Sequence, residues 1–366
     1  MKKIMLVFGT RPEAIKMAPL IKELEKRDGI KTLVCVTAQH REMLDQVLEI
    51  FNIVPDYDLD IMKESQTLSY ITSSILTKID EIMKKELPDI VVVHGDTTTT
   101  FATSLAAFYN KIKIAHVEAG LRTYKKYSPY PEEINRQMVS LVSDYNFAPT
   151  ELTADNLIKD GKDASSIFIT GNTAIDTLSY TVNENYEDDN TKWVGDSRLI
   201  LLTVHRRENI GKSMEDIFDA VKDIVEKFDD IKVIYPLHKN PEVRKYARKY
   251  FEGMERVRLI EPLDVIKFHN LINKSYLIMT DSGGIQEEAP ALGKPVLVLR
   301  NDTERKEGVE SGTLRLLGTD KNNIFKNTCE ILEDEKIYQE IAQSKNPYGD
   351  GRASKKIADI LQREDI

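Results

Sequence analysis

Three carboxylates in the first half of the chain have the types and spacing of a catalytic acid–base set. Asp96 follows the apolar run Ile90–Val93, Glu118 follows the run Ile114–Val117, and Glu132 lies in the segment PEEINRQ. If the acids come from the ends of neighbouring strands, they converge at one edge of a parallel sheet. Acids confined together can have their pKa values pushed apart, which gives one base and one acid.

Asp96 also has a purely structural interpretation. It stands in VVVHGDTTTT (residues 91–100), between an apolar run and four threonines. Asp is a favoured helix N-cap, and threonines are natural residues at a helix start. The two roles are compatible, and the expected proximity of Glu118 and Glu132 favours a catalytic role for Asp96.

Histidine and arginine occupy similar positions in the second half of the chain. His205 and Arg206 follow the apolar run Leu199–Val204, and His238 follows the run Val233–Leu237. Such cations can offset the charge of a pyrophosphate, and a histidine can also protonate a leaving phosphate. HExxH spacing is absent and the histidines are scattered over separate strands, so we predict no metal site.

The segment TDSGGIQEEAPALGKP (residues 280–295) is the strongest local signal. Gly283 and Gly284 follow Ser282 at an expected strand-to-helix turn, where backbone amides can approach a phosphate. Glu288, about one helical turn farther on, can accept hydrogen bonds from ribose hydroxyls. The alternative is a tight turn before a helix whose early acids only complement the dipole. That reading is preferred for Glu287, which we expect to be exposed.

A basic pair near the N-terminus completes the candidates. GTRPEAIK (residues 9–16) combines a glycine turn, Arg11, Pro12 at an expected helix start, and Lys16. Arg11 and Lys16 are about one and a half turns apart. Both can face the same site, although Lys16 alone would also suit a solvated helix surface.

The elements that must position these residues alternate between short apolar runs and longer amphipathic stretches, which predicts an α/β protein with parallel sheets. We expect two doubly wound, Rossmann-like domains with a cleft between them, residues 1–173 and 174–349, divided near Gly171–Thr177. The polar stretch of residues 179–198 leads into the second domain. Expected strands are Ile4–Phe8, Leu33–Thr37, Ile90–Val93, Ile114–Val117, Tyr145–Ala148, Ile167–Thr170, Leu199–Val204, Val233–Leu237, Val257–Ile260, Leu277–Thr280 and Pro295–Leu299.

Composition limits the classes of partner and the compartment. The 366 residues carry a formal net charge of −9, which disfavours nucleic acid as a partner. No segment approaches the roughly 20 apolar residues of a membrane span, and the apolar run after MKK is too short for a secretory signal. We expect a cytoplasmic protein, not bound to a membrane, whose two cysteines, Cys35 and Cys329, are reduced core thiols.

Together these segments resemble the non-hydrolysing UDP-N-acetylglucosamine 2-epimerases. The resemblance is carried by FGTRPEAIKMAPL, TAQHREMLDQVL, VHGDTTTTFATSLAAFY, HVEAGLRT, PEEINRQ, FITGNTAIDTL, HRREN and DSGGIQEEAPALGKPVLVLRNDTERKEGVESGT, in order from Met5 to about Arg315. It implies a GT-B fold with a last helix, about residues 350–366, that packs back on the first domain. It also implies a homodimer, no added cofactor, and interconversion of UDP-GlcNAc and UDP-ManNAc.

The family's chemistry assigns roles to the candidates. UDP is eliminated to give bound 2-acetamidoglucal and then added back, with a proton delivered to the opposite face of carbon 2. By resemblance, Asp96, Glu118 and Glu132 are the catalytic acids and His205 assists the departure and return of UDP. The nucleotide is held by Arg11, Lys16, Phe268, Ser282, Gly283, Gly284, Glu288 and Arg305.

Relatives often use a second UDP-GlcNAc as activator, and the matching residues here are Gln39, Glu132, Arg206 and His238. This sequence has Glu42 and Ser65 where Gln and Arg are usual. An added acid and a missing cation should weaken anion binding there. Leu263 also replaces a glutamine that is frequent near the uracil.

Three other functions share parts of these patterns. A GT-B glycosyltransferase would need an acceptor pocket and one base. A hydrolysing epimerase would release free ManNAc and UDP, and a UDP-sugar sensor would not need the carboxylates. The acid set favours the epimerase over the sensor and the transferase.

Overall fold

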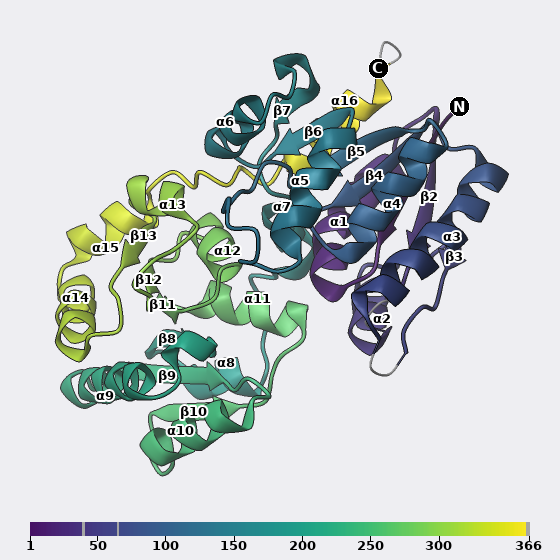
Figure 1. Cartoon of the computed structure of the whole chain (residues 1–366). Helices are drawn as coiled ribbons and strands as arrows, with labels where there is room; N and C mark the ends of the chain where they lie inside the picture. Colours follow the sequence, from purple (N-terminus) through teal and green to yellow (C-terminus); the bar gives the residue numbers. More distant parts are fainter. Residues whose placement is uncertain (39–40, 64–65, 364–366) are drawn as a thin grey trace. The chain divides into compact units, whose positions relative to one another are not determined.

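The computed structural model describes residues 1–38, 41–63 and 66–363. The chain forms two compact units (Figure 1). Unit 1 contains residues 1–180 and the segment from Tyr348 onward, and unit 2 is Thr181–Pro347. Within the described ranges, no helix is both long and apolar enough to cross a membrane.

Unit 1 is built on a parallel sheet of seven strands in the order β3-β2-β1-β4-β5-β6-β7. The strands are β1 Lys2–Phe8, β2 Ile30–Val36, β3 Tyr57–Asp58, β4 Ile90–His94, β5 Lys113–Val117, β6 Tyr145–Ala148 and β7 Ile167–Ile169. Its helices are α1 Arg11–Leu24, α2 Arg41–Ile50, α3 Leu68–Glu86, α4 Thr98–Tyr109, α5 Glu132–Val142, α6 Glu151–Lys159, α7 Thr173–Thr181 and α16 Ala353–Gln362, with the short 3-10 turn Ala164–Ser166.

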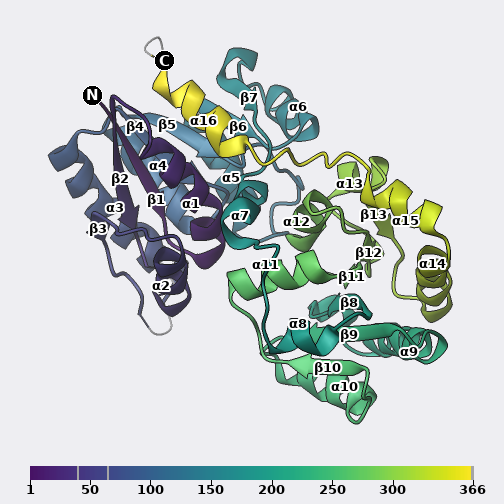
Figure 2. The same ribbon diagram turned by 180° about the vertical axis from the view of Figure 1, so that it is seen from behind.

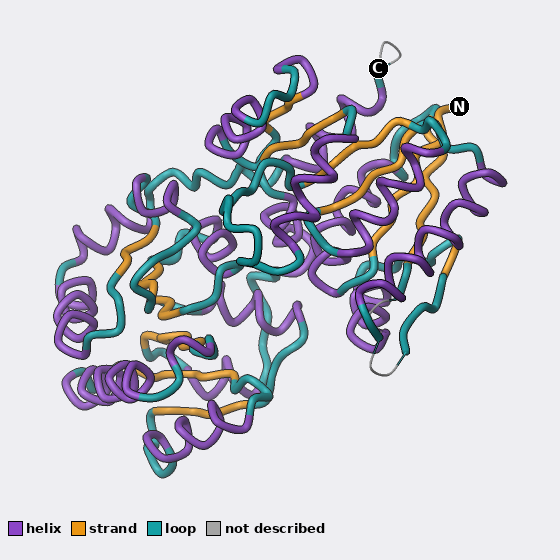
Figure 3. The backbone as a smooth tube through the Cα atoms, viewed as in Figure 1, coloured by secondary structure: helices purple, strands orange, loops and turns teal. Residues whose placement is uncertain are grey.

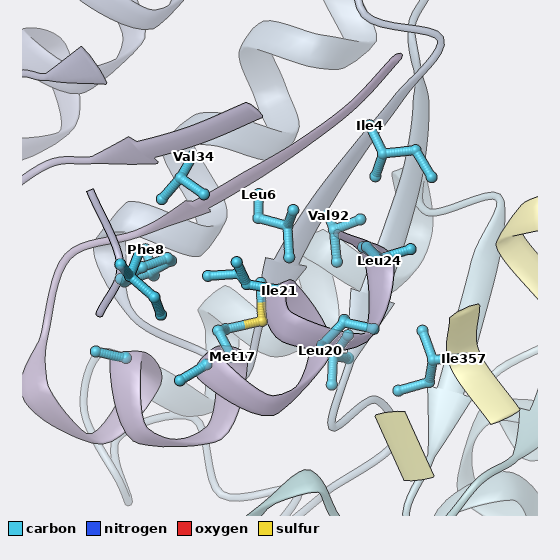
Figure 4. Close-up of a cluster of buried hydrophobic side chains, with 14 of the residues drawn as sticks. Ile4, Leu6, Phe8, Met17, Leu20, Ile21, Leu24, Val34, Val92 and Ile357 are labelled. Carbon is cyan, nitrogen blue, oxygen red and sulfur yellow. The ribbon is translucent and has the colours of Figure 1, made fainter. Parts of the chain in front are cut away.

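Both faces of this sheet are covered, which explains why its inner strands are mostly apolar. Ile4, Leu6 and Phe8 of β1 point into one core together with residues of α1, α2 and α16. Met5 and Val7 point into the opposite core, with residues of α3 and α4. Figure 4 shows part of the first core, where Met17, Leu20, Ile21 and Leu24 of α1 face Leu6 and Val92 of the sheet.

Helix α16 returns the chain to unit 1. It contacts α1, beside which it lies in Figure 2, and its residue Ile357 is fully buried in the same core. The carboxylate of Asp176 in α7 accepts hydrogen bonds from the backbone nitrogens of Ala353 (3.1 Å) and Ser354 (2.7 Å). This contact supplies the N-terminal capping of α16 from another helix.

Unit 2 repeats the plan with six parallel strands in the order β10-β9-β8-β11-β12-β13 (Figure 3). The strands are β8 Arg198–Thr203, β9 Ile231–Pro236, β10 Val257–Ile260, β11 Leu277–Thr280, β12 Val296–Val298 and β13 Leu314–Leu316. The helices are α8 Asp189–Val194, α9 Lys212–Lys227, α10 Pro241–Phe251, α11 Val265–Lys274, α12 Ile285–Ala291, α13 Lys306–Glu310, α14 Lys321–Glu333 and α15 Glu335–Ala342, with the 3-10 turn Arg207–Asn209.

The predicted α/β class with two parallel sheets is confirmed, and every expected strand overlaps an observed one. Two edge strands, β3 and β13, were not predicted because they have only two and three residues and carry polar side chains. The polar stretch 179–198 contains α8. The units divide at the end of α7, whereas the predicted division lies at its start. Cys35 and Cys329 are both buried free thiols.

Candidate active site

At the junction of β4 and α4, the residue that caps the helix is not Asp96. Gly95 turns the chain after β4 with a φ of 68°, and its nitrogen donates to the backbone oxygen of Val117 at 2.9 Å. The N-cap of α4 is Thr97, whose hydroxyl accepts from the backbone nitrogen of Thr100 at 3.2 Å. The capping interpretation of Asp96 is therefore wrong, because the next residue performs that role.

The carboxylate of Asp96 is instead paired with the guanidinium of Arg136 in α5. Burial raises the pKa of Asp96, and nearby Glu118 raises it further, while Arg136 and Lys16 act in the opposite direction. Asn135 fixes the backbone by donating to the Asp96 oxygen at 3.0 Å. A mostly buried carboxyl group whose pKa depends on a neighbouring cation is suited to accept and return a proton.

Glu118 follows β5 in a left-handed conformation, with a φ of 62°, which L-residues rarely adopt. Its side chain is paired with the ammonium of Lys16, so the sequence-predicted residues Lys16 and Glu118 do come together. Asn172 Nδ2 donates to Glu118 Oε2 at 3.2 Å, and His94 Nε2 lies 3.7 Å from the same oxygen. Burial lowers the pKa of His94 to about 4, so this imidazole is neutral near pH 7.

The neighbouring acids Glu132 and Glu133 differ in environment. Glu132 is the first residue of α5 and half-buried, so it does not follow a strand as we had expected. Glu133 is buried and accepts hydrogen bonds from the backbone nitrogens of Thr123 and Tyr124, both at 3.0 Å. These bonds and one from Gln137 lower its pKa although burial alone would raise it. Glu133 therefore holds the preceding loop in place.

A buried acid at the start of α1 joins two of the loops that carry site residues. Glu13 accepts from the backbone nitrogens of Gly9 (3.0 Å) and Thr10 (2.8 Å). It also accepts from the hydroxyls of Thr97 (2.6 Å) and Thr100 (3.2 Å) of the neighbouring junction. Burial raises the pKa of Glu13. The start of α1, where Arg11 is half-buried, is thereby fixed to Thr97, the residue beside Asp96.

In unit 2, His205 and Arg206 form a turn after β8 that is held by Asp281, the residue after β11. The buried Asp281 carboxylate accepts from the backbone nitrogens of His205 and Arg206, both at 2.9 Å. Asn209 Nδ2 donates to the same oxygen at 3.0 Å. His238 stacks on His205, with ring centroids 5.1 Å apart and planes inclined by 10°. Burial lowers the pKa of His205.

The Ser282–Gly283–Gly284 turn lies against Arg305. A Cβ atom at Gly283 would lie 2.9 Å from Nη1 of Arg305, so only glycine fits without moving that side chain. Glu287, which we had expected to be exposed, is buried and accepts from Arg305 Nε at 2.9 Å. The prediction failed because the partner of Glu287 is eighteen residues away in the sequence.

Glu288 and Phe268 occupy the neighbouring part of unit 2. Glu288 Oε2 lies 3.6 Å from Nε2 of the buried His269, whose Nδ1 is 2.7 Å from the hydroxyl of Thr181. Phe268 packs, partly buried, against the apolar cluster that also includes Leu263. Asp281, Asn172, His94 and Arg136 were missed from the sequence. For Arg136 a signal existed, since it is four residues from Glu132 on α5.

The comparison with known proteins gives a consistent result. The sequence model of the family described as UDP-N-acetylglucosamine 2-epimerase matches residues 22–362. The chain belongs to this family. It is 59% identical over 359 residues to the UDP-N-acetylglucosamine 2-epimerase of Bacillus subtilis, covering 98% of this chain and 94% of that protein.

Solved structures of family members have the same fold. A crystal structure of a UDP-N-acetylglucosamine 2-epimerase from Listeria monocytogenes, itself described as putative, has a TM-score of 0.95 and 53% identity, with 99% of this chain and 96% of that chain covered. The Neisseria meningitidis enzyme, solved bound to UDP-GlcNAc, has a TM-score of 0.87 and 47% identity, with 98% and 99% covered. The GT-B-like α/β fold predicted from the family resemblance is thus confirmed.

The residues that the family resemblance connects with an activator are only partly described. Gln39 and Ser65 lie outside the described residues, and so does the side chain of Glu42. Arg206 and His238 both lie at the His205 turn, and Nε of Arg206 donates to the backbone oxygen of Asp281 at 2.9 Å. Among the side chains that the structure describes, no group of three or more His, Cys, Asp or Glu residues could hold a metal ion.

Proposed function

We propose that the protein interconverts UDP-GlcNAc and UDP-ManNAc, without net hydrolysis, by eliminating UDP and adding it back. Carbon 2 of the sugar is not next to a carbonyl that would acidify its proton, so direct proton exchange would be very slow. Loss of the C2 proton together with cleavage of the bond from C1 to the phosphate oxygen gives 2-acetamidoglucal and UDP. Addition of UDP with a proton delivered to the other face of C2 completes the inversion.

The observation that carries this proposal is the pair of strand-end carboxylates in unit 1. Asp96 and Glu118 follow the adjacent strands β4 and β5, and each is paired with a separate cation, Arg136 or Lys16. Inversion at C2 requires one group that removes a proton and another that delivers one. Two acids paired with different cations can have different pKa values, which suits this chemistry. We assign the C2 proton transfers to Asp96, Glu118 and Glu132.

Unit 2 carries the groups suited to the departing nucleotide. His205 and Arg206 follow β8, and the glycine turn with Arg305 follows β11. We assign the diphosphate to His205, Arg305 and the amides of Ser282–Gly284, with Arg11 and Lys16 as further cations. Glu288 is assigned to the ribose and Phe268 to the uracil. The bound UDP-GlcNAc in the Neisseria meningitidis relative supports the choice of ligand.

The test is incubation of the purified protein with UDP-GlcNAc in deuterated water, without an acceptor or added metal, followed by NMR. We expect UDP-ManNAc, with deuterium entering carbon 2 of both isomers. Accumulation of free ManNAc and UDP would show a hydrolysing epimerase instead. No reaction would contradict the proposal and favour a transferase or a sensor.

We also propose that activation by a second UDP-GlcNAc is weak in this protein, because Glu42 and Ser65 place an extra acid and no cation where relatives bind that molecule. Starting from UDP-ManNAc, the rate should change little when trace UDP-GlcNAc is added. Complete inactivity until UDP-GlcNAc is supplied would refute this. A homodimer is proposed from the family resemblance, and light scattering of the purified protein would test it.

A further inference from the structure

We propose that Asp281 is a positioning residue that orients His205 and selects the tautomer in which its Nδ1 carries the hydrogen. This inference rests on the proposed role of His205 beside the departing UDP. The family resemblance assigned no role to Asp281. The contacts of Asp281 within unit 2 support this role.

Asp281 fixes the backbone of the turn that carries His205. Its carboxylate is fully buried and accepts from the backbone nitrogen of His205 at both oxygens, at 3.1 Å to Oδ1 and 2.9 Å to Oδ2. It also accepts from the nitrogen of Arg206 at 2.9 Å. Through its own backbone oxygen, Asp281 accepts from Nε of Arg206 at 2.9 Å. Asp281 therefore holds both His205 and Arg206, with its side chain and with its backbone oxygen.

The same carboxylate faces one edge of the imidazole. Nδ1 of His205 lies 3.5 Å from Oδ1 of Asp281, and the His205 side chain remains 35% exposed. A carboxylate beside Nδ1 favours the tautomer with the hydrogen on that nitrogen. Nε2 is then left to accept a proton from a bound molecule or to return one. The stacked His238 is held separately, since its own Nδ1 accepts from the backbone nitrogen of Asn240 at 3.1 Å.

Charged neighbours act on His205 in opposite directions. Burial lowers its pKa most strongly, His238 and Arg206 lower it further, and Asp281 raises it. Loss of the Asp281 charge should therefore lower the His205 pKa again. A smaller fraction of His205 would then be protonated and able to donate to the leaving phosphate oxygen.

The first test uses the unaltered protein without ligand. Nitrogen-15 NMR of the neutral imidazole should show His205 with its hydrogen on Nδ1, and the signal can be assigned by its loss in His205→Gln. A His205 with its hydrogen on Nε2 would overturn the proposal. The assignment needs a folded His205→Gln variant, but the test needs no substitution at Asp281.

The second test compares Asp281→Asn with Asn209→Ala. Asn209 donates to Asp281 Oδ2 and to the backbone oxygen of Leu299. Both variants therefore remove hydrogen bonds at the same turn. Only Asp281→Asn removes the carboxylate charge. For Asp281→Asn we expect a lower His205 pKa and a kcat about 10- to 100-fold lower. This loss is smaller than the 100- to 10,000-fold typical of losing an acid–base group itself. The effect on KM should be smaller.

Asn209→Ala should lower thermal stability while the His205 pKa stays unchanged. If both variants lose stability and kcat to the same extent, with no change in the His205 pKa, Asp281 is only structural and the proposal is wrong. The tautomer and the pKa are measured without turnover. Failure of the proposed function would be seen separately, as absence of UDP-ManNAc formation by the unaltered protein.

Discussion

Arg136 holds the carboxylate of Asp96 from forty positions farther along the chain. The helix that starts beside Asp96 is capped by Thr97, so the Asp96 side chain is not needed for the helix end. The carboxylate is therefore held by one cation at the end of a buried strand, where its proton affinity depends on that cation.

Asp96→Asn should abolish deuterium incorporation at carbon 2, lowering the rate about 100- to 10,000-fold, because the amide cannot exchange a proton. UDP binding should be nearly unchanged when measured by calorimetry. The melting temperature should also change little, since the cap of α4 remains.

Thr97→Ala is the matched control for Asp96→Asn. It should reduce the free energy of unfolding by at least about 1 kcal/mol, since it removes the N-cap and also the hydrogen bond from Thr97 to the buried Glu13. If Asp96→Asn unfolds the protein more than Thr97→Ala does, the assignment of the cap to Thr97 is contradicted.

Arg136→Gln should move one limb of the pH profile of kcat/KM to higher pH. Arg136 lowers the Asp96 pKa, so its removal leaves burial and Glu118 to raise that pKa further. If Asp96 is the base, the acidic limb moves to higher pH, and if it is the acid, the alkaline limb does. The limb that moves identifies the role. A profile in which neither limb moves would argue against Asp96 as a proton-transfer group.

Glu13→Gln should change how stability depends on pH. Burial raises the folded-state pKa of Glu13 above 4.5, so its contribution to stability is complete below that pH and is lost as the pH rises through the folded pKa. The variant should be least stable, relative to the unaltered protein, near pH 4.5, and the difference should narrow toward pH 7. Thermal unfolding across this range measures it. Glu49→Gln, at an exposed acid on α2, is the control for the same substitution without burial.

Gly283→Ala should weaken UDP binding, by roughly tenfold if one charge-assisted contact is lost. The new Cβ would lie 2.9 Å from Arg305 Nη1 and displace the guanidinium. At Gly284 a Cβ would meet only Oε1 of Glu288, at 4.0 Å, so Gly284→Ala should cause a smaller loss. Calorimetry with UDP compares the two. Equal losses would contradict the steric explanation.

Ile357→Ala should lower the free energy of unfolding by about 2–5 kcal/mol, because it leaves a cavity in a fully buried position of the unit 1 core. Lys355→Ala, at an exposed position of the same helix, should stay within about 0.5 kcal/mol of the unaltered protein. Denaturant unfolding measures both. A small effect of Ile357→Ala would show that α16 contributes little to that core.

Much of the fold was predictable because buried parallel strands are continuously apolar. The apolar run Leu277–Thr280, for example, was placed with correct ends on that signal. The edge strand β13 was missed because it has three residues and an arginine. Apolar continuity is a property of strands covered on both faces, so it fails at the edges of a sheet.

The site was predictable where residues directly follow strands. Asp96, Glu118 and His205 lie just after strands, as expected, and the pairing of Lys16 with Glu118 brings two predicted residues together. Partners that act through long-range contacts were missed. Asp281 stood inside a recognised motif, but nothing in its neighbours indicated that it binds the backbone of a turn seventy-six residues earlier. Glu287 was misassigned for the same reason.

The return of α16 to unit 1 has a consequence for biosynthesis. Unit 2 is contiguous in sequence, so a growing chain contains all of it before Ile357 is made. The α1 face of the unit 1 core stays open until that time, because α16 supplies part of its apolar covering. Nascent or truncated chains would expose this face to chaperones and proteases, although most of unit 1 is synthesised first.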